Sequence, residues 1–376
     1  MRRRWRRSTA PWKTSSSRSS GSPRRARSRT TRRCASTSTS TPSRTARRSH
    51  MARMMFREAI SQALREEMYR DERVFIMGEE VGRWGGTYAV TRGFLDEFGE
   101  KRVRDTPIAE GVIVGAAAGA AIAGLRPVAE IMTINFAFLA MDQIVNHVAK
   151  LHYMFNGQIT CPIVIRTVGG GGRQLGASHS QSPDVVFAHF PGLKVVAPGT
   201  PADAKGLLKA AIRDDDPILF IEHATLYQVR GEVPDDEDYL VPIGVSDVKR
   251  EGRDVTIVSY SKMLQVSLEA AERLAQEGIE AEVIDLRTLR PLDTRPIIES
   301  VQKTNRVVVV EEGWRTYGVG AEIASRVMEL AFDHLDAPVR RVAQAEVPLP
   351  YNRRLEQMAL PQVDDVIRAM KDVLYL

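Results

Sequence analysis

The sequence predicts an α/β protein with two domains, each built on a largely parallel sheet between helices. The chain of 376 residues is long enough for more than one substantial core. Its content of 43% hydrophobic and 27% charged residues is ordinary for a globular protein. From residue 51 onward, apolar runs of strand length alternate with segments of helical period. This alternation indicates parallel sheets with helices on both faces, the doubly wound arrangement.

Residues 1–50 form a separate, strongly basic segment. They contain 15 Arg and one Lys but no Asp or Glu, so the rest of the chain holds 37 basic and 47 acidic residues. Without Leu, Ile, Val or Phe, this Arg/Ser-rich extension is expected to be disordered. Three interpretations are open: a nucleic-acid-binding arm, an organelle transit peptide, or an extension upstream of a start at Met51. We favour the third, because ordinary globular sequence begins abruptly at Met51.

The first domain is expected over residues 51–235. An amphipathic pattern predicts its first helix, and buried apolar runs predict its strands. In chain order the expected elements are a helix over 55–72, a strand from 73 into an acidic loop, a helix headed by Glu110, a strand over 126–132, a long helix over 137–155, a strand over 161–168, an apolar segment over 192–199, a helix over 200–215 and a strand over 217–223.

An acidic, polar stretch over residues 227–244 marks the domain boundary, and we assign residues 236–250 to a linker. The second domain is expected over residues 251–376. Its expected elements are a strand over 255–260, a helix over 263–278, strands over 280–287 and 306–312, and a helix over 318–330.

Two global features limit the function. Cys34 and Cys161 are too few for a disulfide framework or a cysteine metal site, so a reducing compartment fits best. The most apolar run, at residues 108–125, is rich in Gly and Ala and too weakly hydrophobic for a membrane span.

A single carboxylate, Glu110, stands at the head of this Gly/Ala-rich run. Thr106-Pro107 is a good helix opening, because Pro is tolerated in the first turn. Glycines recur every four residues on one helix face, which predicts close approach of another backbone or a ligand. Glu110 is then either an ordinary first-turn acid favoured by the helix dipole or a proton-handling group at the mouth of a cleft.

The glycine-rich segment Gly169–Ser180 presents His179. It lacks the Gly-Lys-Ser/Thr of a phosphate-binding P-loop, and the chain has no well-placed dinucleotide-binding fingerprint. We interpret it as a loop that allows close approach and presents His179 near a surface or cleft, where the histidine is either structural or functional.

The combination of motifs is more specific than each motif alone. "MGEEVG", "DTPIAEGVIVGAAAGAAIAGL", "DQIVNHVAK", "RQLGASHSQSPD" and "EVIDLRTLRPLD" occur in one order. In this the chain resembles the β subunits of thiamine-diphosphate-dependent 2-oxoacid dehydrogenases, over Met55–Leu376. The resemblance implies a pyrimidine-binding domain followed by a transketolase-type C-terminal α/β domain.

The resemblance implies that Glu110 is the family's catalytic glutamate. Its carboxyl group would share a proton with ring nitrogen N1′ of the cofactor's aminopyrimidine, and we expect burial to keep that proton available near neutral pH. His179 matches a catalytic histidine near the substrate and the incoming lipoyl group. Ile108, Met132 and Phe136 match the residues that contact the pyrimidine ring.

Further positions are implied only by the resemblance. Glu79 and Asp142 match acidic residues on a path between two active sites. A structural potassium site is expected at Asp214, Asp216 and the carbonyls of Ile163, Ala211 and Ile212. Here Asp216 replaces the family's usual Asn and changes one of the expected ligands.

The family's diphosphate-and-magnesium motif, Gly-Asp-Gly followed by Asn, does not occur in the sequence. The chain should therefore bind only the pyrimidine half of thiamine diphosphate and need an α subunit, in an α2β2 tetramer, for the diphosphate and Mg²⁺. The resemblance further implies pyruvate as substrate, a dihydrolipoyl acetyltransferase with lipoyl and subunit-binding domains as partner, and no nucleic-acid or membrane partner.

The alternative within this chemistry is a branched-chain 2-oxoacid or acetoin dehydrogenase β subunit. A cytoplasmic, bacterial location is favoured over the mitochondrial matrix or a plastid. A nucleic-acid-binding protein would explain residues 1–50 and nothing after them.

Overall fold

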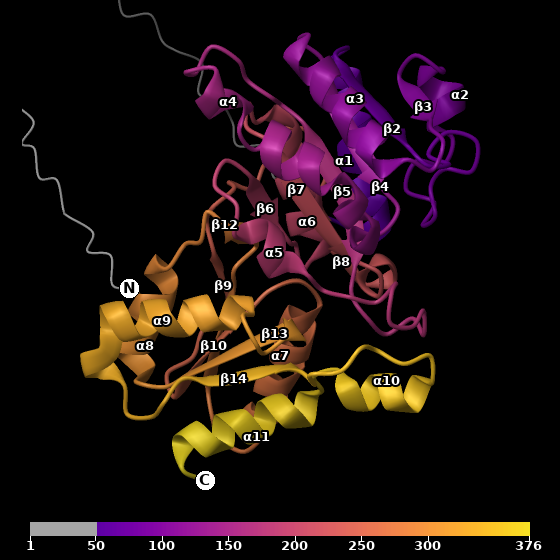
Figure 1. The fold of residues 1–376 in the computed structure, drawn as a ribbon. Coiled ribbons are helices and arrows are strands. Elements are labelled where there is room, and N and C mark those ends of the chain that lie inside the picture. The colour runs from indigo at the N-terminus through magenta and orange to yellow at the C-terminus, as the bar shows by residue number, and fades with distance from the viewer. Residues whose placement is uncertain (1–50) are drawn as a thin grey trace, which may run out of the picture. The chain divides into compact units, whose positions relative to one another are not determined.

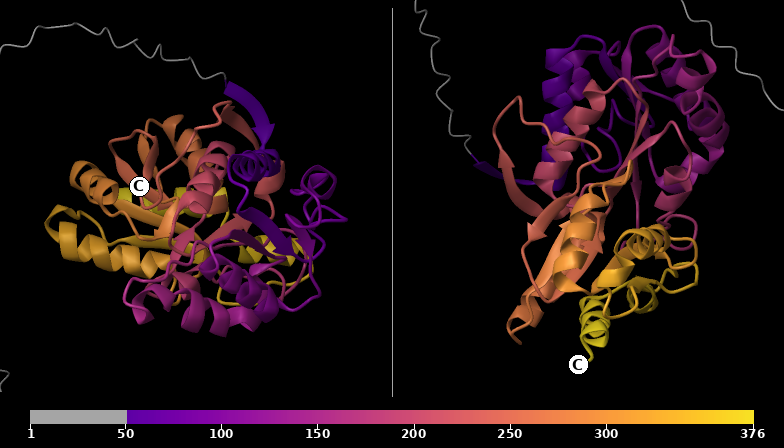
Figure 2. Two further views of the ribbon diagram at one scale, coloured as in Figure 1. Left: turned by 90° about the horizontal axis from the view of Figure 1, so that it is seen from above. Right: turned by 90° about the vertical axis from the view of Figure 1, so that its left-hand side faces the viewer.

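The computed structural model describes residues 51–376 (Figure 1). The extension predicted over residues 1–50 lies outside the described residues, so the interpretations placed on it stay predictions. Figure 2 shows the two sheets and their helices from two further sides. In residues 51–376, no helix is long and apolar enough to cross a membrane.

The first sheet has seven strands in the order β12-β6-β7-β5-β4-β2-β3. All neighbouring pairs are parallel except β12 with β6. The strands are β2 (Val74–Gly78), β3 (Val103–Asp105), β4 (Arg126–Ile131), β5 (Val164–Gly169), β6 (Lys194–Val196), β7 (Ile218–His223) and β12 (Thr288–Arg290).

Helices cover both faces of this sheet, as the alternating sequence predicts. On one face α1 (Phe56–Arg70) and α6 (Pro201–Arg213) pack against each other and share a core with the sheet. The opposite face is covered by α3 (Glu110–Ile122), the 3₁₀ helix η1 (Ile134–Ala140), the π-helix η2 (Asp142–Val148) and α5 (Asp184–Ala188). The doubly wound prediction is confirmed.

The remaining elements of this half are peripheral. Strand β1 (Met51–Met55) pairs with β8 (Arg230–Pro234) in a small antiparallel sheet. The others are α2 (Phe94–Phe98), α4 (Leu151–Met154) and η3 (Leu226–Gln228).

The second sheet has five strands in the order β14-β13-β10-β11-β9, with β9 antiparallel to β11. The strands are β9 (Asp247–Arg250), β10 (Val255–Ser259), β11 (Ala281–Asp285), β13 (Val307–Trp314) and β14 (Arg340–Gln344). One face packs on α7 (Ser261–Ala275) and α11 (Val363–Leu374), and the other on α8 (Arg295–Thr304) and α9 (Val319–Ala331). The last elements are η4 (Phe332–His334) and α10 (Arg353–Ala359).

Three expectations about local structure are wrong. Helix α3 begins at Glu110 and not at Thr106-Pro107, because β3 extends to Asp105 and an irregular segment with a bend at Ile108 follows it. The long helix expected over 137–155 is divided into η1, η2 and α4, since apolar periodicity cannot distinguish hydrogen-bond rings of different size. The segment assigned to a linker contains β9, whose side chains alternate little in burial and gave no strand signal.

Strand β12 was not predicted, and it links the two halves of the chain. It lies between β11 and α8 in sequence, yet it pairs with β6 at the edge of the first sheet. The second half thus completes the first sheet.

Candidate active site

The predicted site residues gather at the carboxyl ends of β2, β4 and β5. The strand order reverses in this region, because β3 lies on one side of β2 and β4 on the other. Ligands of doubly wound sheets bind at such a reversal, outside the carboxyl ends of the strands. Glu79 directly follows β2, Met132 follows β4, and the loop with His179 follows β5.

Glu110 is the first residue of α3, and it is only 3% exposed. The backbone N–H groups of Val112 and Ile113 bond the carbonyl of Ala109, which starts the helix at this point. Ile113 and Val114 pack α3 into the core. The helix therefore holds a buried carboxylate at its N-terminus, at the edge of the sheet.

Glu79 lies close to Glu110 and is 5% exposed. Its Oε1 has no hydrogen-bond partner within residues 51–376. Burial, followed by the nearby carboxylates of Glu110 and Glu130, raises the pKa of Glu79. Glu79 is thus a buried acid among other carboxylates, and both its burial and these like charges favour its protonated form.

A buried ion network lies beside this pair. Arg166 on β5 donates hydrogen bonds to Glu130 on β4 and to both oxygens of Glu222 on β7. Tyr227 donates its hydroxyl to Glu222 at 2.5 Å. Burial raises the pKa of Glu130, although the Arg166 guanidinium opposes this. The network carries a net negative charge when both acids are ionised.

The side chains of Phe136 and His179 pack against each other. Their ring centroids are 5.1 Å apart and the ring planes are nearly perpendicular, at 86°. The His179 side chain is exposed, and its Nδ1 lies 2.9 Å from the Ser178 hydroxyl. The Asn135 side chain bonds the backbone N–H of Gln181 and the Thr133 hydroxyl, which ties η1 to the histidine loop.

Ile108 lies in the segment after β3, and Met132 directly follows β4, so both lie beyond the carboxyl ends of these strands. Ile108 is 79% exposed just before α3, and Met132 is partly buried just after β4. An apolar side chain as exposed as Ile108 is suited to contact a ligand or a partner surface.

Asp142 is not brought to this group. It begins η2 with an exposed side chain, accepts a bond from Asn146 at 2.8 Å and lies 3.6 Å from the His147 ring. Its place on a path between two active sites stays a prediction.

The residues predicted to bind potassium lie together but are occupied by protein cations. Lys194 Nζ lies 2.7 Å from Asp214 and 3.0 Å from Asp216. Arg126 donates to the carbonyls of Ile212 and Asp214 at 3.0 and 2.9 Å. The carbonyls of Ile163 and Ala211 accept backbone N–H bonds from Ile218 and Asp214. Because protein N–H groups already bond these oxygens, they do not fit a cation site, and no part of the proposed reaction depends on potassium.

Within residues 51–376, no group of three or more His, Cys, Asp or Glu side chains is arranged to hold a metal ion.

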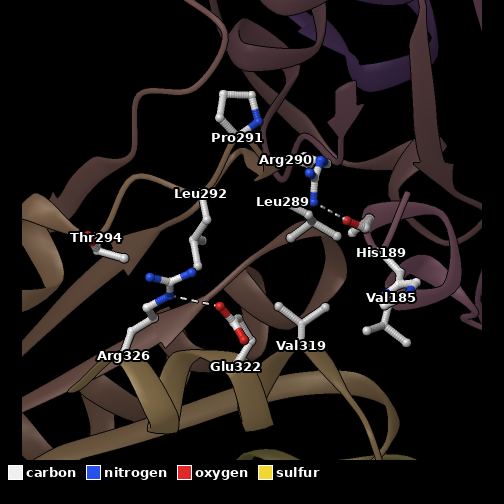
Figure 3. Close-up of a pocket in the computed structure, with 11 residues that line it drawn as sticks. Val185, His189, Leu289, Arg290, Pro291, Leu292, Thr294, Val319, Glu322 and Arg326 are labelled. Carbon is white, nitrogen blue, oxygen red and sulfur yellow. Dashed lines mark hydrogen bonds and ion pairs between the residues drawn. The ribbon is translucent and has the colours of Figure 1, made fainter. Parts of the chain in front are cut away.

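A separate cavity of about 510 Å³ lies between α5, the Leu289–Leu292 segment and α9 (Figure 3). Arg326 bonds Glu322 there, and Arg290 bonds the carbonyl of Ala188. None of the site residues predicted from the sequence lines this cavity. The predicted site residues lie instead around the carboxyl ends of β2, β4 and β5.

Sequence reasoning missed Glu312, Glu356 and His223, which hold the histidine loop. The signal for Glu312 was available, because "VVVVEE" places two acids at the carboxyl end of a buried strand. Glu356 gave no such signal, since it lies on a short helix with mostly exposed neighbours.

The fold and site define a two-domain chain of the transketolase type. Residues 52–230 match the transketolase pyrimidine-binding domain, and residues 244–366 match the transketolase C-terminal domain. A solved structure described as a split-gene transketolase, in an inactive β4 tetramer, is 26% identical, with a TM-score of 0.70. The match covers 86% of this chain and 99% of that chain.

Relatives with higher identity show which family of transketolase-type proteins the chain belongs to. The pyruvate dehydrogenase E1 component subunit beta of Rickettsia felis is 53% identical over 85% of this chain and 98% of its own. The mitochondrial subunit beta-2 of Oryza sativa subsp. japonica is 52% identical, over 86% of each chain. The mitochondrial subunit beta of Dictyostelium discoideum is 51% identical, over 84% of this chain and 90% of its own. The chain belongs to the family of pyruvate dehydrogenase E1 component β subunits.

Proposed function

We propose that this chain, paired with an α subunit, catalyses the thiamine-diphosphate-dependent oxidative decarboxylation of pyruvate. Pyruvate loses CO2, and its remaining two-carbon unit is oxidised to an acetyl group. The disulfide of a lipoyl group is reduced in the same reaction: one sulfur forms the thioester and the other takes up a proton. The family membership supports this reaction, and the placement of Glu110 is the observation that carries it.

The residues at the sheet edge fit the pyrimidine half of the cofactor. Glu110 would hold a ring nitrogen through a shared proton, and the unpartnered, buried Glu79 beside it supports proton exchange at that point. Phe136 would pack against the ring, together with Met132 and Ile108. When bound, the cofactor supplies the electron sink that decarboxylation requires. His179 stands on the loop opposite, where it would donate or orient a proton during acyl transfer.

The remaining assignments concern partners and location. We propose that the α subunit holds the diphosphate and Mg²⁺, in an α2β2 tetramer. The acetyl acceptor is proposed to be the lipoyl domain of a dihydrolipoyl acetyltransferase, whose subunit-binding domain docks on the assembly. A cytoplasmic location is proposed, and named relatives of the chain include mitochondrial proteins.

Mixing the subunits tests the proposal. The purified chain is assayed alone and with its α subunit for thiamine-diphosphate-dependent oxidation of pyruvate by an artificial electron acceptor. We expect activity only in the mixture. Glu110→Gln should lower that activity by roughly 10²–10⁴-fold, the usual contribution of a proton-transferring group. The variant should assemble as the unaltered chain does, because Gln preserves the shape of the buried side chain.

Other outcomes separate the alternatives. Turnover of a branched 2-oxoacid or acetoin but not of pyruvate would keep the mechanism and change the substrate. Activity of the chain alone would contradict the divided site. Full activity of the Glu110→Gln mixture would contradict the role of Glu110.

A further inference from the structure

The histidine loop, residues 170–183 between β5 and α5, is held by the second domain. Glu312, at the end of β13, accepts the backbone N–H of Gly171 at 2.8 Å and the Ser182 hydroxyl at 2.9 Å, both on Oε1. Gly171 and Ser182 are near the two ends of the loop. A single carboxylate oxygen of the second domain therefore closes the base of the loop that carries His179.

The middle of the loop is held by a second carboxylate. Glu356 on α10 is 0% exposed and accepts the N–H groups of Gly172 at 3.0 Å and Gln174 at 3.2 Å. The Gln174 side-chain amide adds a bond of 2.7 Å. Figure 1 shows α10 beside this part of the chain. Glu356 is thus a buried side chain whose two oxygens are taken up by bonds from the loop.

The packing leaves the loop little freedom at its glycines. A Cβ on Gly171 would lie 2.6 Å from Leu349, and one on Gly176 would lie 2.5 Å from the Tyr351 ring. Gly176 also has φ of +80°, which favours glycine. Leu349 and Tyr351 lie just before α10, so the segment 349–356 follows the contour of the loop.

Glu312 is itself fixed by His223. Its Oε2 lies 2.8 Å from His223 Nε2, and the N–H of Thr225 donates to His223 Nδ1 at 3.2 Å. Because an ionised carboxylate can only accept hydrogen bonds, His223 donates its Nε2–H to Glu312. Burial opposes ionisation of Glu312, yet His223 and the bonds from the loop hold its pKa at about 2. Glu312 is thus an ionised acceptor at neutral pH.

We propose that Glu312 and Glu356 are positioning residues for His179, and that the second domain controls the acyl-transfer step through them. This inference rests on the proposed function, in which Glu110 serves decarboxylation and His179 serves transfer to the lipoyl group. Loss of either positioning residue should leave decarboxylation nearly intact, because Glu110 heads α3 and Glu79 follows β2, both outside the loop.

Two reactions measured on the α–β assembly separate these steps. Oxidation of pyruvate by an artificial electron acceptor reports decarboxylation, and acetylation of an isolated lipoyl domain reports transfer. For Glu356→Ala we expect transfer to fall about tenfold or more, as misplacement of a positioned group by an ångström is sufficient for such a loss, with artificial-acceptor turnover changed less than twofold. Glu356→Gln, which retains an acceptor oxygen, should recover part of the transfer rate.

Combination with His179→Ala gives the decisive comparison. If Glu356 acts through His179, the double variant transfers acetyl groups no more slowly than His179→Ala alone. Independent, additive losses would overturn the proposal. So would an equal loss of both reactions in Glu356→Ala, which is the behaviour of a merely structural residue. Gln174→Ala, which removes only the side-chain bonds to Glu356 and to the Gly172 carbonyl, provides a milder variant in case Glu356→Ala folds poorly.

Glu311 offers a matched control for Glu312. It precedes Glu312 on β13, is also buried, and accepts the N–H of Gly320 at the start of α9 instead of the loop. In hydrogen–deuterium exchange, Glu312→Gln should speed exchange across residues 170–182, and Glu311→Gln should not. Unchanged exchange in Glu312→Gln would overturn the positioning role. Because exchange needs no turnover, an assembly inactive with pyruvate would contradict the proposed function alone.

Discussion

The buried carboxylates at the head of α3 and at the histidine loop differ in how they are hydrogen-bonded. At the head of α3, Glu110 and Glu79 are buried together, and Glu79 Oε1 has no hydrogen-bond partner within residues 51–376. At the histidine loop, Glu312 and Glu356 accept several hydrogen bonds each, all from this chain. The first region leaves a buried acceptor without a partner among the described residues, whereas the carboxylates of the second are satisfied by the chain itself.

The surfaces beside these regions differ in the same way. The outer side of α3 exposes Val112 and Ile122, and a Cβ on Gly119 would meet no atom within 4 Å. In the histidine loop, Leu349 and Tyr351 occupy the space that a Cβ on Gly171 or Gly176 would need. An apolar helix side with small residues and open space is suited to close packing by another chain. Changes in the completed regions should therefore leave assembly with another chain intact, and changes on α3 should affect assembly.

The largest effect on stability is expected at the buried ion network of Arg166, Glu130 and Glu222. Arg166→Met removes the cation that Glu130 and Glu222 share, and it leaves two buried carboxylates facing each other. We expect the free energy of unfolding of the purified chain to fall by about 3–5 kcal/mol, as for other broken buried pairs. Chemical denaturation at neutral pH measures this change.

Arg273→Met is the matched control for Arg166→Met. Arg273 pairs with Glu269 on the exposed side of α7 and is 49% exposed, so its loss should cost below about 1 kcal/mol. An equally small loss of stability for Arg166→Met would mean that the buried ion network does not stabilise the chain. Regions completed by the chain's own bonds would then differ less from the open side of α3.

The second effect is a pH dependence at the junction of the two domains. Burial raises the pKa of Asp184 to about 6, with a further contribution from Glu312, and burial raises the pKa of Glu311 to about 7. A carboxyl whose pKa is higher in the folded chain binds more protons there than in the unfolded chain. Stability from these groups is therefore present below about pH 4 and is lost as the pH rises towards 6 to 7.

Each of these carboxyl groups contributes at most about 3 kcal/mol, because every pH unit by which folding raises a pKa corresponds to about 1.36 kcal/mol. The free energy of unfolding is compared at pH 5 and pH 8 for the unaltered chain and for Asp184→Asn combined with Glu311→Gln. We expect the double variant to lose less stability than the unaltered chain between these pH values. Equal losses in both would show that neither carboxyl titrates in this range.

Much of this fold could be predicted from the sequence, because its signals are local. The strands β2, β4, β5 and β7 lie in short runs that are mostly apolar, and α1 and α6 have clear amphipathic patterns. Strand β12 could not be predicted, because its three residues are strand-like only through pairing with β6. The division of residues 134–154 was equally hidden, since its 3₁₀ and π segments each differ from the α-helical period by less than one residue per turn.

The site was only partly predictable for a related reason. Glu110 and His179 stand out in their own segments, one heading an apolar run and one within a glycine-rich loop. Glu356 lies 182 residues beyond Gln174 in sequence, and its role depends on a contact that only the folded chain creates. Asp142 has the right residue type for a proton path, yet its side chain is exposed on η2.

The smallest effect tests the open side of α3. Gly119→Ala adds a methyl group at a helical position with no neighbour within 4 Å, so it should stabilise the purified chain by about 1 kcal/mol. If another chain packs closely on this side of the helix, the same methyl group must weaken assembly with the α subunit. Thermal unfolding of the chain and a titration of α into β measure the two effects. Ala116→Gly, on the same exposed side, should lower stability by a similar amount without adding volume. A stabilised Gly119→Ala chain that assembles as tightly as before would show that no partner approaches α3 here, and Glu79 would then need a ligand alone to satisfy it.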